Sequence, residues 1–141
     1  MSIWFSPLIL EEVQQRGKDT MVQHLGIEIT EVGDNFLRGT MPVDHRTLQP
    51  MGLLHGGASV ALAETLGSIA ANLVIDPAKK YSVGLDINAN HIRSAKNGMV
   101  TGTATPLHIG SSTQVWSIEI KDDQDRLVCI SRLTMAVMDR K

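Results

Sequence analysis

The feature that most constrains the fold is a nearly uncharged run that keeps one carboxylate. Between positions 47 and 75 the only fully charged residue is Glu64. Gly57–Ile75 is rich in Ala and Leu and apolar on most faces, a pattern that predicts a long helix buried on most sides. Asp76-Pro77 marks its end. The rest of the chain therefore has to cover this helix.

Segments on both sides of this helix have the alternating hydrophobicity and flanking turn residues of β-strands. The expected strands are Gly26–Val32, Phe36–Val43, Tyr81–Ile92, Met99–Leu107, Thr113–Lys121 and Leu127–Met138. In the third strand the alternate apolar side chains from Val83 to Ala89 are expected on one face. A short helix is expected over Leu8–Arg16, with Ser6-Pro7 as its start signal. This order predicts an α+β fold, a sheet with the helix on one face, in a single domain spanning residues 1–141.

Composition and charge narrow the classes of partner. The net charge is -2 and no basic run occurs, which argues against a nucleic-acid partner. The single cysteine, Cys129, can form no intramolecular disulfide, which fits a reducing compartment. The apolar start MSIWFSPLIL lacks the basic leader and cleavage site of a signal peptide, and Glu64 and Asn72 interrupt the longest apolar stretch. We expect a cytoplasmic protein with no membrane partner.

Glu64 is the first candidate for chemistry. An ionised carboxylate is costly to bury without a partner, and no Lys or Arg lies three or four positions from Glu64 on the helix. Such a carboxylate is a candidate general base or nucleophile. Two alternatives give Glu64 no catalytic role: it reaches solvent at a helix edge, or it pairs with a distant arginine such as Arg93.

The helical wheel places other small and polar residues beside this carboxylate. At about 100° per residue, Glu64, Thr65, Ser68 and Asn72 share an arc that also holds Gly57 and Ala61. This arc is the one polar face of the predicted helix. A face lined with small residues is suited to a site that admits a ligand.

The start of the helix offers a second chemical feature. At His55-Gly56-Gly57 the free N–H groups of the first turn point outward, and the helix dipole adds partial positive charge. One such N–H can hold a carbonyl oxygen that gains negative charge. However, Gly56 and Glu64 lie roughly 12 Å apart along a helix, too far for both to act on one carbonyl carbon. If both act in one site, the spacing predicts a symmetric dimer whose composite sites each combine two chains.

Three long segments carry a resemblance to a known family: MPVDHRTLQPMGLLHGGASVALAETLGS, VGLDINANHIRS and TPLHIGSSTQVW. Together with the chain around them, they resemble the hotdog-fold acyl-CoA thioesterases of the PaaI-like group, which include aryl-specific members in menaquinone biosynthesis and in proofreading of aryl carrier proteins. The resemblance implies a six-stranded antiparallel sheet wrapped around one long central helix. It also implies edge-to-edge homodimers that often pair into tetramers, and no cofactor, because coenzyme A is part of the substrate.

The same resemblance implies roles for five catalytic-site residues. Glu64 attacks the thioester or activates water, and the Gly56 N–H polarises the thioester carbonyl. Gln49 and His55 lie beside the thioester, where they orient it or assist the departing thiolate. Ser68 helps to hold water or the carboxylate.

Contacts to the coenzyme A arm are also implied by the resemblance. The residues concerned are Gly84, His91, Ile92, Arg93, Ser94, His108, Ile109, Gly110, Ser111, Ser112 and Thr113. Ser94 and Ser111 stand where relatives have Pro and Arg, and a missing guanidinium weakens phosphate contacts. Lys96 or Lys79 is a candidate to compensate.

Other chemistries are weighed against hydrolysis. The five histidines lack metal-ligand spacing and there is no cysteine cluster, so no metal site is expected. A hotdog dehydratase would need a histidine base on the helix, where this chain has Glu64. A protein that binds acyl-CoA without cleaving it has no need of that carboxylate. The acyl group, and the choice between coenzyme A and an acyl carrier protein as the thiol, stay open.

Overall fold

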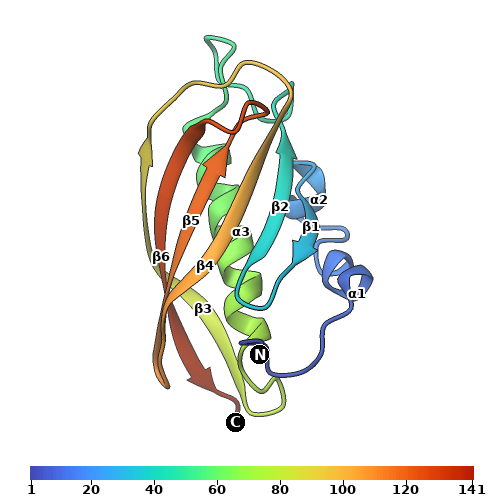
Figure 1. The fold of residues 1–141 in the computed structure, drawn as a ribbon, viewed down its shortest axis with the longest axis vertical. Helices are drawn as coiled ribbons and strands as arrows, with labels where there is room; N and C mark the ends of the chain where they lie inside the picture. Colours follow the sequence, from blue (N-terminus) through green and yellow to red (C-terminus); the bar gives the residue numbers. More distant parts are fainter.

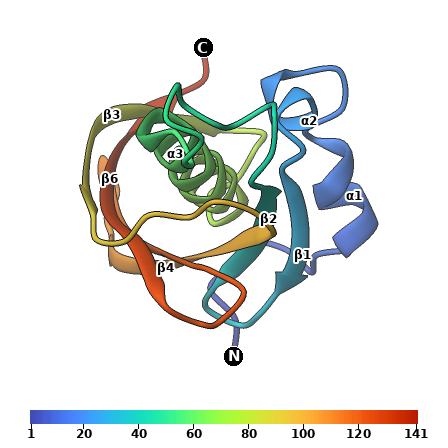
Figure 2. The same ribbon diagram turned by 90° about the horizontal axis from the view of Figure 1, so that it is seen from above.

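All strands of the chain join one antiparallel sheet that curves around a single long helix. The computed structural model describes residues 1–141. Its helices are α1 (Leu10–Gln15), α2 (Met21–His24) and α3 (Gly56–Leu73), and its strands are β1 (Glu28–Val32), β2 (Leu37–Pro42), β3 (Lys80–His91), β4 (Met99–Ile109), β5 (Thr113–Lys121) and β6 (Leu127–Asp139). The strand order is β1-β2-β4-β5-β6-β3, which leaves β1 and β3 as edges. Figures 1 and 2 show the sheet wrapped around α3, with α1 and α2 beside β1.

The predicted order of two strands, one helix and four strands is confirmed. The strand Thr113–Lys121 has the predicted bounds. The N-terminal helix begins at Leu10 rather than Leu8, and its N-cap residue Ile9 has no side-chain cap. The four-residue helix α2 was not predicted; the Thr20 hydroxyl accepts a hydrogen bond from the Val22 N–H at its start. None of the helices has the length and hydropathy needed to cross a bilayer.

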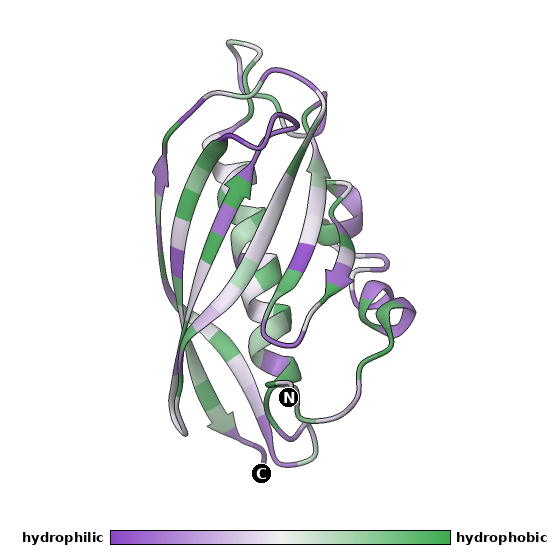
Figure 3. Cartoon of the chain, viewed as in Figure 1, coloured by the Kyte–Doolittle hydropathy of each residue, from purple (hydrophilic) through white to green (hydrophobic).

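The core lies between α3 and the concave face of the sheet. Leu62 and Leu66 of α3 are fully buried, as are Trp116 and Leu133 of the sheet. Gly39 and Gly102 lie opposite each other on β2 and β4, and added Cβ atoms there would lie 2.9 and 2.7 Å from Leu66. The absence of side chains at this pair lets the sheet approach the helix closely. In Figure 3 hydrophobic residues concentrate on α3 and alternate with polar ones along the strands.

The edge strand β3 departs from the alternation expected of it. A β-bulge around Leu85 interrupts its register with β6. Because a bulge adds one residue, it shifts the alternation of side chains beyond it. Val83 and Leu85 are 47% and 64% exposed, whereas Ile87 and Ala89 pack against the core. The prediction that these four side chains share one face is therefore wrong.

Candidate active site

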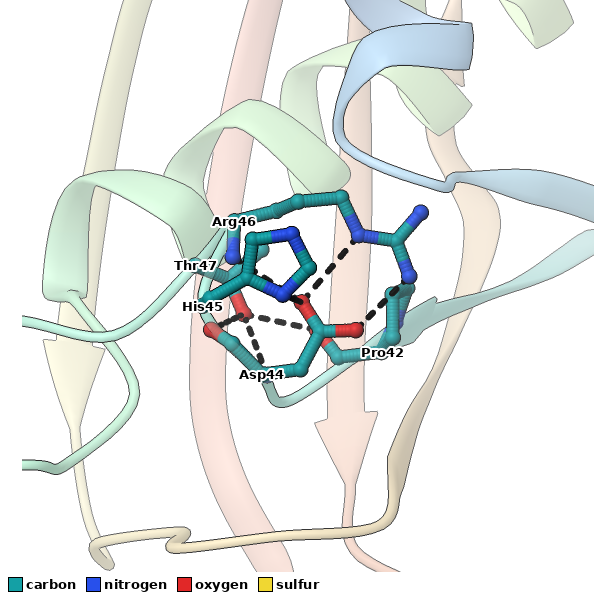
Figure 4. Close-up of polar contacts among 5 residues, drawn as sticks. All are labelled: Pro42, Asp44, His45, Arg46 and Thr47. Carbon is teal, nitrogen blue, oxygen red and sulfur yellow. Dashed lines mark hydrogen bonds and ion pairs between the residues drawn. The ribbon is translucent and has the colours of Figure 1, made fainter.

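The loop before α3 is held by a network that starts at Asp44. The Asp44 carboxylate accepts hydrogen bonds from Arg46 Nε at 3.1 Å, Arg46 Nη2 at 2.7 Å and the Arg46 backbone N–H at 2.9 Å (Figure 4). Hydrogen bonds from the Arg46 side chain and backbone lower the pKa of Asp44 to about 2. The buried Thr47 hydroxyl donates to the Pro42 carbonyl at 2.7 Å. These contacts fix the path of the loop from β2 toward α3.

Two backbone hydrogen bonds then place the start of α3. The His55 N–H donates to the Thr47 carbonyl at 2.8 Å, and the Leu54 N–H donates to the Ala95 carbonyl at 2.7 Å. His55 Nδ1 accepts the Gly57 N–H at 2.8 Å, so this imidazole caps the helix. Gly56, the first helical residue, has no intrahelical acceptor for its own N–H. That N–H is available to a ligand.

A first cavity of about 300 Å³ opens beside this helix start. Predicted site residues line it, namely Gln49, Gly56, His91, Ile92, Arg93 and Ser94. An added Cβ at Gly56 would lie 3.0 Å from His91 Nε2, so the imidazole packs directly against the glycine backbone. The structure therefore brings the predicted carbonyl-binding N–H together with the His91–Ser94 segment. The exposed His55 side chain caps the helix and does not line this cavity.

A second cavity, of about 520 Å³, lies along the middle of α3 and holds Glu64. All of the predicted polar arc except Gly57 lines it, namely Ala61, Glu64, Thr65, Ser68 and Asn72. The half-buried Glu64 forms no ion pair. The alternative in which Glu64 pairs with Arg93 is therefore not realised, because Arg93 lines the first cavity instead.

The opposite wall of the second cavity was missed by the sequence reasoning. Arg16, Thr20, Met21 and Val22 approach α3 from the segment that contains α2. No spacing relates these residues to Glu64, more than forty positions later in the chain. The Thr20 cap could have revealed α2 itself, but only the tertiary fold brings this segment to the cavity.

The Glu64 carboxylate also lies against the edge strand. An added Cβ at Gly84 would lie 2.5 Å from Glu64 Oε2. The absence of a side chain at Gly84 therefore leaves room for the carboxylate beside the β3 backbone. This contact joins the predicted catalytic carboxylate to Gly84, a residue predicted to contact the coenzyme A arm.

Within one chain the predicted site residues fall into separate groups. Gln49 and Gly56 line the first cavity, whereas Glu64 and Ser68 line the second, and no residue lines both.

A third group is the segment His108–Thr113, which was predicted to contact the coenzyme A arm and which forms the hairpin turn between β4 and β5. The Ser112 carbonyl accepts the Val137 N–H, whereas the Val128 carbonyl accepts the Arg93 N–H. Positions 128 and 137 of β6 are about 30 Å apart at 3.3 Å per residue, so the hairpin lies at the far end of the sheet from His91–Ser94.

Cys129 is not a nucleophile candidate. Its side chain is fully buried, and burial raises the pKa of the Cys129 thiol above its ordinary value. Of these two candidate nucleophiles, Glu64 is therefore the one that faces a cavity.

Comparisons with known proteins agree with this geometry. A family model described as "Thioesterase superfamily" matches residues 51–129. The 1,4-dihydroxy-2-naphthoyl-CoA hydrolase of Escherichia coli is 53% identical over 96% of this chain and 99% of its own length. The proofreading thioesterase EntH of Cronobacter turicensis is 51% identical over 96% of this chain and 98% of its own length.

Solved structures give the same result. The crystal structure of a thioesterase from Haemophilus influenzae superposes with a TM-score of 0.94 and 50% identity, covering 97% of this chain and 95% of that one. A thioesterase from Pseudomonas aeruginosa superposes with a TM-score of 0.97 and 45% identity, covering 99% of this chain and 100% of that one. The family model and the near-complete coverage by relatives give one answer: this chain belongs to the thioesterase superfamily, and it is a thioester hydrolase with the hotdog fold.

Proposed function

We propose that this chain hydrolyses acyl-CoA thioesters with aromatic acyl groups, and that 1,4-dihydroxy-2-naphthoyl-CoA of menaquinone biosynthesis is its leading substrate. The observation that carries the proposal is the unpaired Glu64 carboxylate. It faces a cavity lined by small and polar residues of α3 and by the apolar side chains of Met21, Val22 and Ile69. The E. coli relative with that hydrolase name supports the choice of acyl group, since it matches nearly the whole chain.

In this mechanism Glu64 either attacks the thioester carbon or removes a proton from an attacking water. In the first route the C–S bond breaks as Glu64 forms a mixed anhydride, and water then hydrolyses the anhydride and restores the carboxylate. In the second route the water oxygen forms the new C–O bond and the C–S bond breaks. In both routes the thiolate leaves and takes up a proton. A Gly56 N–H holds the carbonyl oxygen as it becomes negative. Gln49 and His55 orient the thioester, and Ser68, one helical turn after Glu64, holds the water or the carboxylate.

The working site is composite in this proposal, with Gly56 supplied by one subunit and Glu64 by the other. Both catalytic groups touch the same edge strand, Glu64 at Gly84 and Gly56 at His91. If two β3 edges pair antiparallel about a two-fold axis between these positions, Gly84 of one chain comes near His91 of its mate. The two cavities then meet. Pairing of such dimers into a tetramer is part of the same proposal.

This arrangement also indicates where the coenzyme A arm binds. The first cavity shares Arg93, Ser94 and Ala95 with a polar cavity of about 560 Å³ that Lys96 and Arg126 also line. Asp122 pairs with Arg126, whereas Arg93 and Lys96 form no ion pair. Arg93 and Lys96 are thus free to contact phosphates, with Lys96 compensating for the guanidinium missing at Ser111.

The hairpin His108–Thr113 is a further part of the coenzyme A site in this proposal. Two-fold pairing turns one sheet end to end against the other. The hairpin of one chain thereby approaches the His91–Ser94 segment of its mate, and the arm lies between them.

A carrier-protein thioester is the second candidate substrate. The EntH relative is named a proofreading thioesterase and matches nearly the whole chain. Both thiols present the same pantetheine arm, so the catalytic groups proposed here serve either one. The cytoplasm stays a prediction for the location of this reaction.

Thiol release from a panel of thioesters tests the proposal. The panel holds aromatic and aliphatic acyl-CoA esters, 1,4-dihydroxy-2-naphthoyl-CoA and an aroyl carrier protein. Wild type is compared with Glu64→Gln and with Glu119→Gln, a control on β5. We expect Glu64→Gln to lose at least about a hundredfold in kcat and Glu119→Gln to lose nothing. A wild type that binds every ester and cleaves none would instead favour a binding protein.

A further inference from the structure

Asn72 makes three hydrogen bonds, two of which join the last turn of α3 to the edge strand β3. Its Nδ2 donates to the Ser68 carbonyl at 3.0 Å and to the Ser82 carbonyl at 3.2 Å. Its Oδ1 accepts the Ser82 N–H at 2.9 Å. The amide therefore satisfies both backbone groups of Ser82, as a neighbouring strand would.

This contact occurs beside the catalytic carboxylate. Asn72 lines the same cavity as Glu64 and Ser68, one turn beyond Ser68 on the same face of α3. Ser82 lies two residues before Gly84, the residue that packs against Glu64 Oε2. A shift of β3 relative to α3 would therefore change the space around the carboxylate.

The contact uses the Ser82 backbone and not its side chain. Ser82 is 6% exposed, and its hydroxyl has no hydrogen-bond partner. Replacing Ser82 by alanine therefore removes an unsatisfied polar group and leaves the Asn72 contact intact.

We propose that Asn72 is a positioning residue of the active site: by holding Ser82 of β3 against α3, it sets the distance between Gly84 and the Glu64 carboxylate. This inference rests on the proposed role of Glu64 in hydrolysis. The Asn72 amide hydrogen-bonds to backbone groups of Ser68 and Ser82 and not to Glu64. Its effect reaches the reaction through the placement of the carboxylate.

The kinetic test compares three variants with wild type. Asn72→Ala is expected to lower kcat about tenfold or more, since a small misplacement of a catalytic group is costly, and to change KM less than about threefold. Ser82→Ala is expected to keep wild-type kcat. Gln114→Ala is the matched structural control, because Gln114 Nε2 ties β5 to the Ala71 carbonyl of the same helical turn at 3.2 Å.

A merely structural Asn72 predicts a different pattern. Both Asn72→Ala and Gln114→Ala would then lower the melting temperature and leave the kcat of the folded fraction unchanged. That result would overturn the inference, as would a loss in Ser82→Ala equal to the loss in Asn72→Ala.

A double-mutant cycle tests the route through Gly84. Gly84→Ala places a methyl group where Glu64 Oε2 lies and displaces the carboxylate by itself. If Asn72 acts through this contact, Asn72→Ala costs less in the Gly84→Ala background than in wild type. Additive losses would contradict the route.

Backbone hydrogen exchange separates this inference from the hydrolase proposal. Asn72→Ala should increase exchange at the Ser82 N–H, and Gln114→Ala should not, whatever the substrate. Unchanged exchange at Ser82 in Asn72→Ala overturns the inference without bearing on hydrolysis. A wild type that cleaves no thioester overturns the hydrolase proposal without bearing on the contact between Asn72 and the Ser82 backbone.

Discussion

At the scale of single residues, His55 caps α3, and the proposed function gives its imidazole a second role in orienting the thioester. Its Nδ1 accepts the Gly57 N–H at 2.8 Å, which caps α3. His55→Ala should cost about 1 kcal/mol in the free energy of unfolding, whereas His55→Asn, a good N-cap, should cost only a few tenths. Both variants should lose activity, because neither keeps the imidazole.

Urea denaturation together with thiol-release kinetics checks this prediction. If His55→Ala is as stable as wild type, the capping role is wrong. If His55→Asn keeps full activity, the imidazole has no part in the reaction.

At the scale of elements, the close packing of the sheet against α3 depends on Leu66. This side chain lies over the opposed pair Gly39 and Gly102, where an added Cβ would approach it to 2.9 and 2.7 Å. Gly102→Ala should destabilise the fold by about 1 to 3 kcal/mol through overpacking, more than alanine gains in strand propensity. Denaturation of Gly102→Ala in wild-type and Leu66→Ala backgrounds measures this. An equal cost in both backgrounds would show that Leu66 is not the obstacle.

The loop before α3 has a pH dependence that follows from Asp44. Hydrogen bonds from Arg46 lower its pKa in the folded protein from 3.8 to about 2. Because the folded pKa is depressed, the stabilisation is present above pH 3.8 and disappears as the pH falls toward 2.

The melting temperatures of wild type and Asp44→Asn check this prediction. Wild type should melt higher at neutral pH, and the difference should vanish as the pH falls from about 4 to about 2. A difference that stays constant over that range would mean that the Asp44 charge does not stabilise the loop.

The sequence predicts an element well when neighbouring residues determine it, and poorly when strand pairing or tertiary packing determines it. The strand Thr113–Lys121 follows from alternating hydrophobicity. The helix α3 follows from an Ala- and Leu-rich, nearly uncharged segment and from the stop signal Asp76-Pro77. The bulge around Leu85 could not be read from the alternating residues, because it depends on how β3 pairs with β6. The wall of the second cavity that Arg16 and Met21 form depends on tertiary packing, so no spacing in the sequence predicts it.

At the scale of the whole molecule, the exposed cations Arg93 and Lys96 lie beside the first cavity without ion-pair partners. We propose that they bind the nucleotide phosphates that coenzyme A carries and acyl-pantetheine lacks. Lys96→Ala should lower kcat/KM for an acyl-CoA about fivefold, the size expected of an exposed charge contact, and leave the matching acyl-pantetheine unaffected. Lys18→Ala is the control, because the exposed Lys18 lines neither cavity of the proposed arm and lies just before α2, beside the other edge strand β1. Parallel kinetics on both thioesters measure this. Equal losses on both substrates would place Lys96 outside the nucleotide contacts.

The central claim is that one working site combines Gln49 and Gly56 of one chain with Glu64 of another. Subunit complementation tests it most directly. Glu64→Ala and Gln49→Ala chains with different tags are co-expressed, and the mixed dimer is purified and assayed. Each parent dimer should be nearly inactive, whereas the mixed dimer holds one intact site and should recover about half of wild-type kcat per dimer. A mixed dimer as inactive as both parents would contradict the composite site.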